Sequence, residues 1–237
     1  MYNGRKILAI VTARGGSKGL PGKNIKEMNG KPLITYTLDS IGSSRYLDSY
    51  YISTDSEAIA DVCEKYGYSV PELRPPELAK DSTPSVDVLL YTIEKLENDG
   101  ERYDYFVLLE PTSPLRKKDD IDKMIQMAVD HPEANGSISI GKVHLENPAV
   151  LKLINERGYI RPFTSDAKDV YQRQQEEPAF FPYGVGYLIK TEVFKQCKGI
   201  YVDNMLPYMI ERWQNYEIDD YYDFLCVEAI QREQMKG

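Results

Sequence analysis

The hydrophobic pattern alternates between short apolar runs and longer amphipathic segments along roughly the first half of the chain. Residues 6–13 (KILAIVTA) are apolar almost throughout, which is typical of a parallel strand buried on both faces. Two further strands are predicted at 50–54 and 105–109. Helices are predicted to begin at Pro32, after a cap at Asp55 or Ser56, near Ser85 and near Asp119. This alternation predicts βαβ units, and hence an α/β fold with a mostly parallel, twisted sheet and flanking helices.

The alternation loosens in the second half of the chain. Short strand-like runs and a polar segment with prolines predict a hairpin-like excursion at approximately residues 142–182, inserted in a single domain of residues 1–237. A strand at 184–189, a helix from Thr191 and an extended segment at 216–219 before the last helix follow. Ligands of such sheets bind at the carboxyl ends of the strands. Chemistry is therefore expected in the loops at 14–24, 53–55, 110–116 and 217–219.

The distribution of charge along the chain indicates which class of partner is expected. The formal net charge is −8, yet the first 31 residues carry seven lysines or arginines and one acid, Glu27. A nucleic-acid binder needs an extended basic face, whereas this compact basic stretch suits a small anion. Nucleic acid is therefore not expected as a partner.

Apolar segments and the spacing of cysteines indicate in which cellular compartment the protein is expected. No apolar run approaches the roughly 18 residues of a membrane span, and the start of the chain lacks the apolar region of a signal peptide. The scattered cysteines have no CxxC spacing, which favours neither a disulfide framework nor a zinc site: Cys63, Cys197 and Cys226. We expect a soluble, cytoplasmic protein with no membrane partner.

The loop after the first strand, RGGSKGLPGKN at residues 14–24, carries the most specific chemistry. Its four glycines let the backbone approach a ligand, and Arg14, Lys18 and Lys23 suit phosphate oxygens. It is not a P-loop, because Ser17 stands where that motif needs glycine and Asn24 follows the lysine. The loop therefore predicts a phosphate site, the alternative being a flexible basic surface loop.

These residues belong to a longer resemblance. RGGSKG with GKN resembles the signature of the CMP-sialic acid synthetases (acylneuraminate cytidylyltransferases). Further blocks similar to this family follow in order: STD at 53–55, RPPELA at 74–79 with Asp81, LEPTSPLR at 109–116, RQQ at 173–175 and EID at 217–219. The resemblance implies a Rossmann-like, GT-A-like nucleotidyltransferase fold with a dimerisation arm, and a homodimer.

The resemblance also implies the nucleotide-binding residues. Arg14, Gly15, Ser17, Lys18 and Lys23 would hold the triphosphate of CTP, and Arg14, Lys18 and Lys23 would act on transition-state charge. Arg74 resembles the arginine that contacts cytosine, whose O2 and N3 accept hydrogen bonds. Thr83 and Ser85 align with positions near the ribose. Two assignments keep a structural alternative: Asn24 contacts the nucleotide or caps the following turn, and Ser85 contacts the ribose or caps a helix.

On the sugar side, the resemblance implies contacts from Glu110, Arg173, Gln174, Phe180 and Phe181. Arg173 would reach a carboxylate or phosphate, and the two phenylalanines would lie near an N-acyl group or pack in the core. Glu110 stands where well-known family members carry glutamine, which leaves the exact sugar open. Two other departures are Tyr183 in place of asparagine and Val150 in place of a lysine, for which Lys152 is a substitute. Arg116 is expected to bond carbonyls of its own loop.

Glu217 and Asp219 predict a magnesium site. Their spacing places both carboxylates on one face of an extended segment, and Mg²⁺ commonly takes one or two carboxylates plus substrate oxygens. The family usually has aspartate at both positions. The structural alternative is that Asp219 and Asp220 cap the last helix.

The expected activity is transfer of CMP from CTP to a sialic acid or related nonulosonic acid, such as N-acetylneuraminate or legionaminate, with release of pyrophosphate. No Ser-His-Asp or Cys-His arrangement is visible, so direct displacement is favoured over a covalent intermediate. One alternative is another sugar nucleotidyltransferase, such as one acting on 3-deoxy-manno-octulosonate. Another is a non-catalytic nucleotide-sensing domain.

Overall fold

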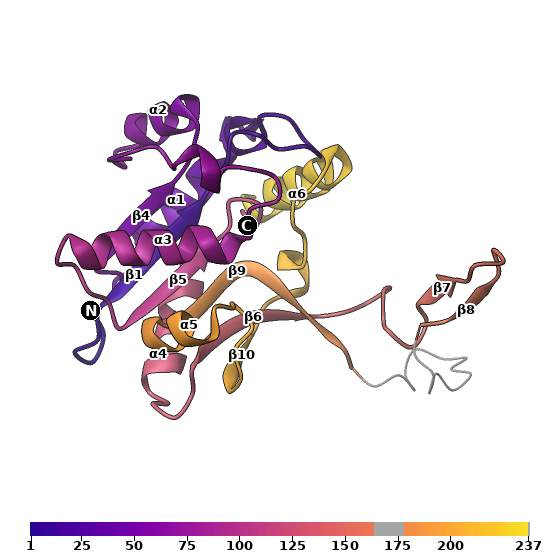
Figure 1. Ribbon diagram of the computed structural model, residues 1–237. Helices are drawn as coiled ribbons and strands as arrows, with labels where there is room; N and C mark the ends of the chain where they lie inside the picture. The colour runs from indigo at the N-terminus through magenta and orange to yellow at the C-terminus, as the bar shows by residue number, and fades with distance from the viewer. Residues whose placement is uncertain (164–177, 237) are drawn as a thin grey trace.

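A computed structural model describes residues 1–163 and 178–236, and its centre is a six-stranded sheet (Figure 1). The strand order is β10-β6-β9-β5-β1-β4. The strands are β1 (Ile7–Thr12), β4 (Ser49–Ser53), β5 (Tyr105–Leu109), β6 (Gly136–Lys142), β9 (Phe180–Lys190) and β10 (Met205–Met209). Strand β9 is antiparallel to β5 and β6, whereas β1 is parallel to β4 and β5, and β10 to β6. The prediction of a mostly parallel sheet is confirmed.

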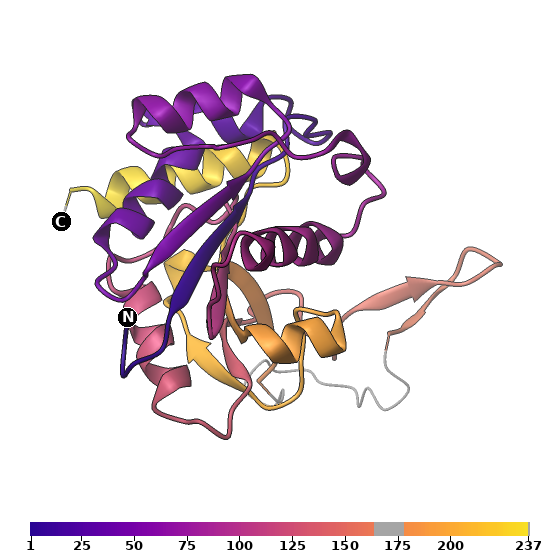
Figure 2. The same cartoon turned by 60° about the vertical axis from the view of Figure 1, so that its left-hand side comes forward.

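Helices cover both faces of the sheet, as two views show (Figures 1 and 2). One face packs on α1 (Leu33–Ser43), α2 (Glu57–Lys65) and α4 (Asp120–Val129), the other on α3 (Ser85–Asn98) and α5 (Thr191–Cys197). Strand β1 is buried on both faces: Ile7, Ala9 and Val11 join one core cluster, and Leu8 and Ile10 join the other. That arrangement explains why its sequence is an unbroken apolar run.

A third core cluster lies beyond the carboxyl end of β1. There α6 (Tyr221–Gln234) contributes Phe224 and Val227, which pack with Leu20, Met28 and Ile218. The short elements η1 (Lys23–Ile25), β2 (Glu27–Met28) and β3 (Lys31–Pro32) lie between β1 and α1. This cluster anchors the basic loop and the segment before α6 in one packed unit.

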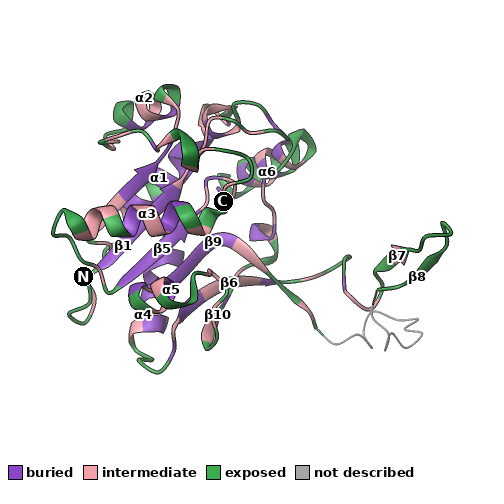
Figure 3. Cartoon of the chain, viewed as in Figure 1, coloured by how far each residue is buried: buried purple, intermediate pink, exposed green. Residues whose placement is uncertain are grey.

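A two-stranded arm projects from the domain body (Figure 1). It contains β7 (Lys152–Ile154) and β8 (Ile160–Pro162), which pair in antiparallel register. The outer ends of β6 and β9 lead toward it, because Lys142 pairs with Phe180 and Gly141 with Phe181. Figure 3 shows the contrast between a buried central sheet and an exposed arm. The arm agrees with the excursion expected at 142–182.

The remaining elements are η2 (Pro76–Leu78) and η4 (Arg212–Gln214). The sequence pattern did not reveal β8, β10 or the β2–β3 pair, and it placed the start of β9 four residues late. Within the described ranges, no helix is both long enough and apolar enough to cross a bilayer.

Candidate functional site

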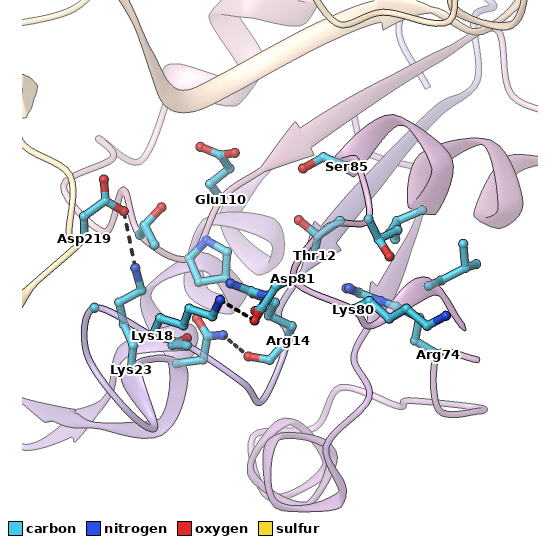
Figure 4. Close-up of a pocket in the computed structure, with 18 of the residues that line it drawn as sticks. Thr12, Arg14, Lys18, Lys23, Arg74, Lys80, Asp81, Ser85, Glu110 and Asp219 are labelled. Carbon is cyan, nitrogen blue, oxygen red and sulfur yellow. Dashed lines mark hydrogen bonds and ion pairs between the residues drawn. The ribbon is translucent and has the colours of Figure 1, made fainter. Parts of the chain in front are cut away.

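A cavity of about 600 Å³ opens at the carboxyl ends of β1 and β5 (Figure 4). Three of the four loops expected to carry chemistry contribute to its lining, and the loop that leads into α3 adds a fourth wall. The lining is mostly polar: Thr12, Arg14, Ser17, Lys18, Gly19, Lys23, Asn24, Arg74, Leu78, Lys80, Asp81, Thr83, Ser85, Val88, Glu110, Pro111, Thr112, Glu217 and Asp219. Its position follows the rule for ligand sites in open α/β sheets.

The basic loop is folded by its own backbone and by one buried amide. Asn24 is buried, and its Nδ2 donates to the carbonyl of Arg14 at 2.9 Å, which ties the two ends of the loop together. Gly22 adopts φ 66°, a conformation that glycine accepts without strain. The capping alternative for Asn24 is wrong, because Gly22 occupies the cap of η1. Asn24 still lines the cavity, so a nucleotide contact stays a prediction.

Close approach explains a second glycine of the loop. A Cβ atom on Gly19 would lie 2.3 Å from the carbonyl oxygen of Asp219, so no other residue fits without movement of the backbone. Gly15 has a different role, because its amide donates to Asp55 Oδ1 at 2.8 Å and it does not line the cavity. The loop at 53–55 therefore supports the basic loop instead of lining the site.

Every cation of the basic loop that lines the cavity is paired with a carboxylate of the same cavity. Arg14 and Lys18 both form ion pairs with Asp81, the second at 2.7 Å. Lys23 lies 3.5 Å from Asp219 Oδ1 and donates to the carbonyl of Ile218 at 2.5 Å. These pairs hold three cationic side chains along one wall, the arrangement that a chain of phosphates requires.

Arg74 lies buried on another wall of the cavity. Its Nε donates to Ser53 Oγ at 2.9 Å and its Nη2 donates to the Ser53 carbonyl at 2.7 Å, so the guanidinium is fixed by the end of β4. Burial lowers the pKa of Arg74 from its usual value. Leu78 and Val88 supply apolar lining in the same cavity. A rigid arginine beside apolar side chains suits a planar, hydrogen-bonding group.

The start of α3 provides two hydroxyls. Ser85 is the first residue of α3 and lines the cavity, while Pro84 is the cap residue, so the capping alternative for Ser85 is wrong. Thr83 also lines the cavity, and its Oγ1 donates to the carbonyl of Glu77 at 3.2 Å. Their contact with a ribose stays a prediction.

Two glutamates meet at the carboxyl end of β5. Burial and the nearby charge of Glu217 raise the pKa of Glu110 to about 7. Glu217 Oε1 accepts from Ser113 Oγ at 2.7 Å and from the amide of Gly184. Gly184 must lack a side chain here, because a Cβ atom would meet Glu110 Oε2 at 2.2 Å. Glu110 thus has an environment that favours its protonated form near neutral pH.

The two predicted magnesium ligands, Asp219 and Glu217, differ in how many of their carboxylate oxygens are free to bind an ion. Asp219 is 94% exposed and its carboxylate faces Lys23, whereas Asp220 caps α6 by accepting from the amides of Tyr222 and Asp223. The capping alternative is therefore right for Asp220 and wrong for Asp219. Glu217 uses one oxygen to hold the fold. No cluster of three or more potential ligands occurs among the described residues. Asp219 fits a magnesium ion whose other ligands are substrate oxygens and water.

Arg116 is a structural residue, as the sequence indicated. Its guanidinium donates to the carbonyls of Glu110 and Gly184 at 2.6 Å each and to that of Val185 at 2.7 Å. Three carbonyls from β9 and from the end of β5 are thereby satisfied by one buried side chain. Arg116 fixes the backbone that presents Glu110.

The remaining sugar-side predictions fall outside the cavity. Phe180 and Phe181 are exposed on the outer end of β9, and neither lines the cavity nor packs in a core cluster. Val150 is exposed before β7, and Tyr183 packs on Phe181 with ring centroids 5.0 Å apart. Arg173 and Gln174 lie outside the described residues. The described part of one chain therefore brings together the nucleotide-side predictions other than Gly15, and adds only Glu110, Glu217 and Asp219 to them.

Several lining residues were missed from the sequence. Thr12, Pro111 and Thr112 lie at strand ends that were already expected to carry chemistry, so their positions were a usable signal. Lys80 and Asp81 follow the RPPELA block directly, yet nothing local indicates that Asp81 reaches Arg14, a residue 67 positions away.

A mostly parallel α/β sheet with a cationic cavity at its carboxyl edge defines a class of proteins that bind phosphorylated small molecules. Comparisons with known proteins narrow this class. The family model described as cytidylyltransferase matches residues 8–216. The chain therefore belongs to the cytidylyltransferase family.

Relatives in sequence carry related names. The chain is 31% identical to N-acylneuraminate cytidylyltransferase of Streptococcus agalactiae over 224 residues, which cover 94% of this chain and 52% of that protein. It therefore spans about half the length of that relative. It is 30% identical to CMP-N,N'-diacetyllegionaminic acid synthase of Legionella pneumophila over 228 residues, covering 95% and 96% of the two chains.

Solved structures share the fold. A CMP:2-keto-3-deoxy-manno-octonic acid synthetase complexed with CTP matches with a TM-score of 0.72 at 16% identity, covering 97% of this chain and 99% of that one. A 4-diphosphocytidyl-2C-methyl-D-erythritol synthase matches with a TM-score of 0.66 at 14% identity, covering 96% and 100%. These matches confirm the Rossmann-like nucleotidyltransferase fold.

Proposed function

We propose that this chain transfers CMP from CTP to a nonulosonic acid of the sialic or legionaminic type and releases pyrophosphate. The single observation that carries the proposal is the cavity, which combines three cations of one glycine-rich loop with a buried arginine and four carboxylic acid side chains. Membership of the cytidylyltransferase family and the names of the relatives support the same activity.

The lining suggests how CTP lies in the cavity. Arg14, Lys18 and Lys23 face the triphosphate, and Arg74, fixed by Ser53, faces the cytosine. Arginine donors match the O2 and N3 acceptors of cytosine. Uracil keeps the O2 acceptor but carries an N–H donor at N3, so it matches an arginine less well. Thr83 and Ser85 lie on the wall of the ribose. This placement leaves Glu110, Thr112 and Glu217 for the acceptor sugar.

The reaction is a displacement at phosphorus. The anomeric hydroxyl of the 2-keto sugar acid attacks the α-phosphorus of CTP, the new C–O–P link forms, and the bond from the α-phosphorus to the bridging oxygen of pyrophosphate breaks. Negative charge grows on the phosphate oxygens and on the leaving pyrophosphate. Lys23, Lys18 and Arg14 stabilise that charge from fixed positions, which is the main task of the protein in such transfers.

The proton of the attacking hydroxyl needs an acceptor. Glu110 lines the cavity, and burial together with the charge of Glu217 disfavours the ionised form of its carboxyl group. With a pKa raised to about 7, it accepts a proton near neutral pH and, once protonated, donates a hydrogen bond. This gives a chemical reason for a carboxyl group on the sugar side.

Magnesium is part of the proposal. Asp219 would be the first ligand of the ion, and the second carboxylate oxygen of Glu217 would be the other protein ligand. The bound ion would neutralise phosphate charge. Lys23 pairs with Asp219 and lines the same cavity, so its ammonium group would also face the phosphates.

We also propose a homodimer that forms through the arm. Large apolar side chains are exposed there beyond what a free surface normally carries: Ile154, Tyr159, Ile160, Phe163, Phe180 and Phe181. A second chain that covers the arm would bury them and bring further residues to the sugar side of the cavity. Because CTP is a cytoplasmic metabolite, we place the enzyme in the cytoplasm.

Release of pyrophosphate tests the proposed activity. Purified protein is incubated with CTP, Mg²⁺ and a panel of nonulosonic acids, with 3-deoxy-manno-octulosonate and sugar phosphates as other acceptors. The expected result is pyrophosphate formation with a nonulosonic acid and CTP, and little with UTP, GTP or ATP. Binding of CTP without turnover on any acceptor would contradict the proposal and favour a nucleotide-sensing domain.

A further inference from the structure

Asp81 occupies a position that the predicted roles do not explain. It belongs to the loop between η2 and α3, and its carboxylate bridges two cations of the opposite loop, Arg14 and Lys18 (Figure 4). One carboxylate oxygen pairs with Arg14 and the other with Lys18. Both partners hold the pKa of Asp81 below its usual value, Lys18 most strongly.

The two cations depend on Asp81 for their orientation. Arg14 and Lys18 have no other ion-pair partner among residues 1–163 and 178–236, and neither side chain donates a hydrogen bond to any further described group. Asp81 itself is 46% exposed, so the bridge lies in the open part of the cavity and not in the core. Exposed ion pairs of this kind are weak, and a stronger anion displaces them readily.

The donors that bind Asp81, on Arg14 and Lys18, are also the ones that we assign to the triphosphate. A carboxylate presents two oxygens to one arginine and one lysine, much as two oxygens of a polyphosphate would. A polyphosphate brings several negative charges into the cavity, and Asp81 brings only one. The carboxylate would then lie beside the phosphates, where its charge repels them.

We infer that Asp81 is a displaceable counter-ion: it holds Arg14 and Lys18 in place while the cavity is empty, gives them up to the phosphates of CTP, and takes them back as pyrophosphate leaves. It is a positioning residue and touches no reacting atom. The inference rests on the proposed function, because it assumes that the cavity binds a polyphosphate.

Binding measurements distinguish this role from a purely structural one, in which Asp81 would stay bound to Arg14 and Lys18 in the complex. A displaceable counter-ion opposes the anion, so removing its charge tightens the binding of pyrophosphate and CTP. A brace that stays in place would orient the cations in the complex as well, so removing it would weaken binding. The structure favours the first role, because the bridge uses the cations themselves and lies in the exposed part of the cavity.

Calorimetric titration of pyrophosphate and of CTP, each with Mg²⁺, into wild type and Asp81→Asn tests the inference. At low ionic strength we expect the Kd for pyrophosphate to fall by about fivefold in the variant, in line with a single exposed charge. The difference shrinks at high salt because exposed charges are screened. In turnover, the KM for CTP falls, kcat falls or stays the same, and inhibition by pyrophosphate becomes stronger.

Matched variants complete the test. Asp87→Asn removes a carboxylate from the first turn of α3. Asp87 does not line the cavity and forms no ion pair with any residue that the structure describes, so the Kd values of this variant should equal those of wild type. Asp81→Glu keeps the charge and should restore wild-type affinity. Asp81→Ser serves as a second neutral variant if thermal unfolding shows that Asp81→Asn does not fold.

Equal or weaker binding of pyrophosphate by folded Asp81→Asn or Asp81→Ser would overturn the inference. The binding comparison does not depend on turnover. A wild-type chain that binds CTP but never releases pyrophosphate contradicts the proposed function, and the comparison still decides the role of Asp81. A wild-type chain that binds neither CTP nor pyrophosphate would overturn both.

Discussion

The proposed nucleotide side and the proposed sugar side of the cavity are built in different ways. On the nucleotide side, Asn24 ties the two ends of the basic loop together through the carbonyl of Arg14, and Arg74 is fixed by Ser53 at the end of β4. On the sugar side, Glu110 and Glu217 are fixed, but Phe180 and Phe181 lie exposed on a strand that leaves the domain. The described part of one chain thus supplies the cavity residues that we assign to the nucleotide, whereas we propose that the sugar side needs a second chain.

The largest expected effect is on the nucleotide side. Lys23→Ala removes the least exposed cation of the basic loop and should lower kcat by about a hundredfold to a thousandfold, as loss of one group that stabilises transition-state charge does. Steady-state pyrophosphate release measures it. Lys65→Ala, on the exposed end of α2, is the control. A Lys23→Ala enzyme with near wild-type kcat would show that Lys23 only helps to fold the loop.

The next effect concerns the choice of base. Arg74→Lys keeps the charge but loses the planar fork that bonds Ser53 and that we propose faces the base. We expect the KM for CTP to rise about tenfold and the preference for CTP over UTP to shrink by a similar factor, with a smaller change in kcat. Initial rates with each nucleotide measure both, with Arg102→Lys as the control. An unchanged ratio of CTP to UTP would remove Arg74 from base recognition.

The contrast between the two sides also explains what the sequence predicted. Arg14, Lys18 and Lys23 were predictable because one short segment carries them after a strand whose apolar run is unmistakable. Their pairing with Asp81 was not, since it depends on how two loops meet in space. The antiparallel insertion of β9 between β5 and β6 was equally hidden, because strand order is a long-range property.

Glu110 gives the next effect, which depends on pH. Its folded-state pKa of about 7 lies above the ordinary value of 4.5 for a glutamate, so the folded state prefers the protonated acid. The stability of the fold therefore falls as pH rises above about 4.5, and the loss is complete above about 7. Glu110→Gln, which cannot ionise, should therefore be more stable than wild type by about 1–3 kcal/mol at pH 8. The difference should vanish near pH 4.

Denaturant unfolding at pH 4, 6 and 8 measures this difference. If ionisation of Glu110 makes kcat/KM depend on pH near pH 7, that dependence should be absent in Glu110→Gln. Activity of the variant on the acceptor panel shows whether its preferred sugar changes. A stability difference that is independent of pH would mean that Glu110 is ionised normally in the folded chain.

The smallest effect on the folded chain comes from the arm. Ile160 is 73% exposed in β8, so Ile160→Glu should leave the free energy of unfolding of a single chain within about 0.5 kcal/mol. If the arm joins two chains, the variant should be monomeric in light scattering and lose sugar affinity more than CTP affinity. Met235→Glu, at a similarly exposed site on the body, is the control. A wild-type chain that is monomeric at assay concentrations would remove the proposed role of the arm.

The central claim is that the cavity uses CTP to activate a nonulosonic acid. The most direct test is pyrophosphate release by the wild-type chain with CTP, Mg²⁺ and each of N-acetylneuraminate and N,N'-diacetyllegionaminate, with the CMP-sugar identified by mass. The account predicts pyrophosphate and CMP-sugar in equal amounts with at least one of these acids, and formation of both products slower by about a hundredfold or more in Lys23→Ala at the same enzyme concentration. CTP binding without either product, across all nonulosonic acids tested, would contradict it.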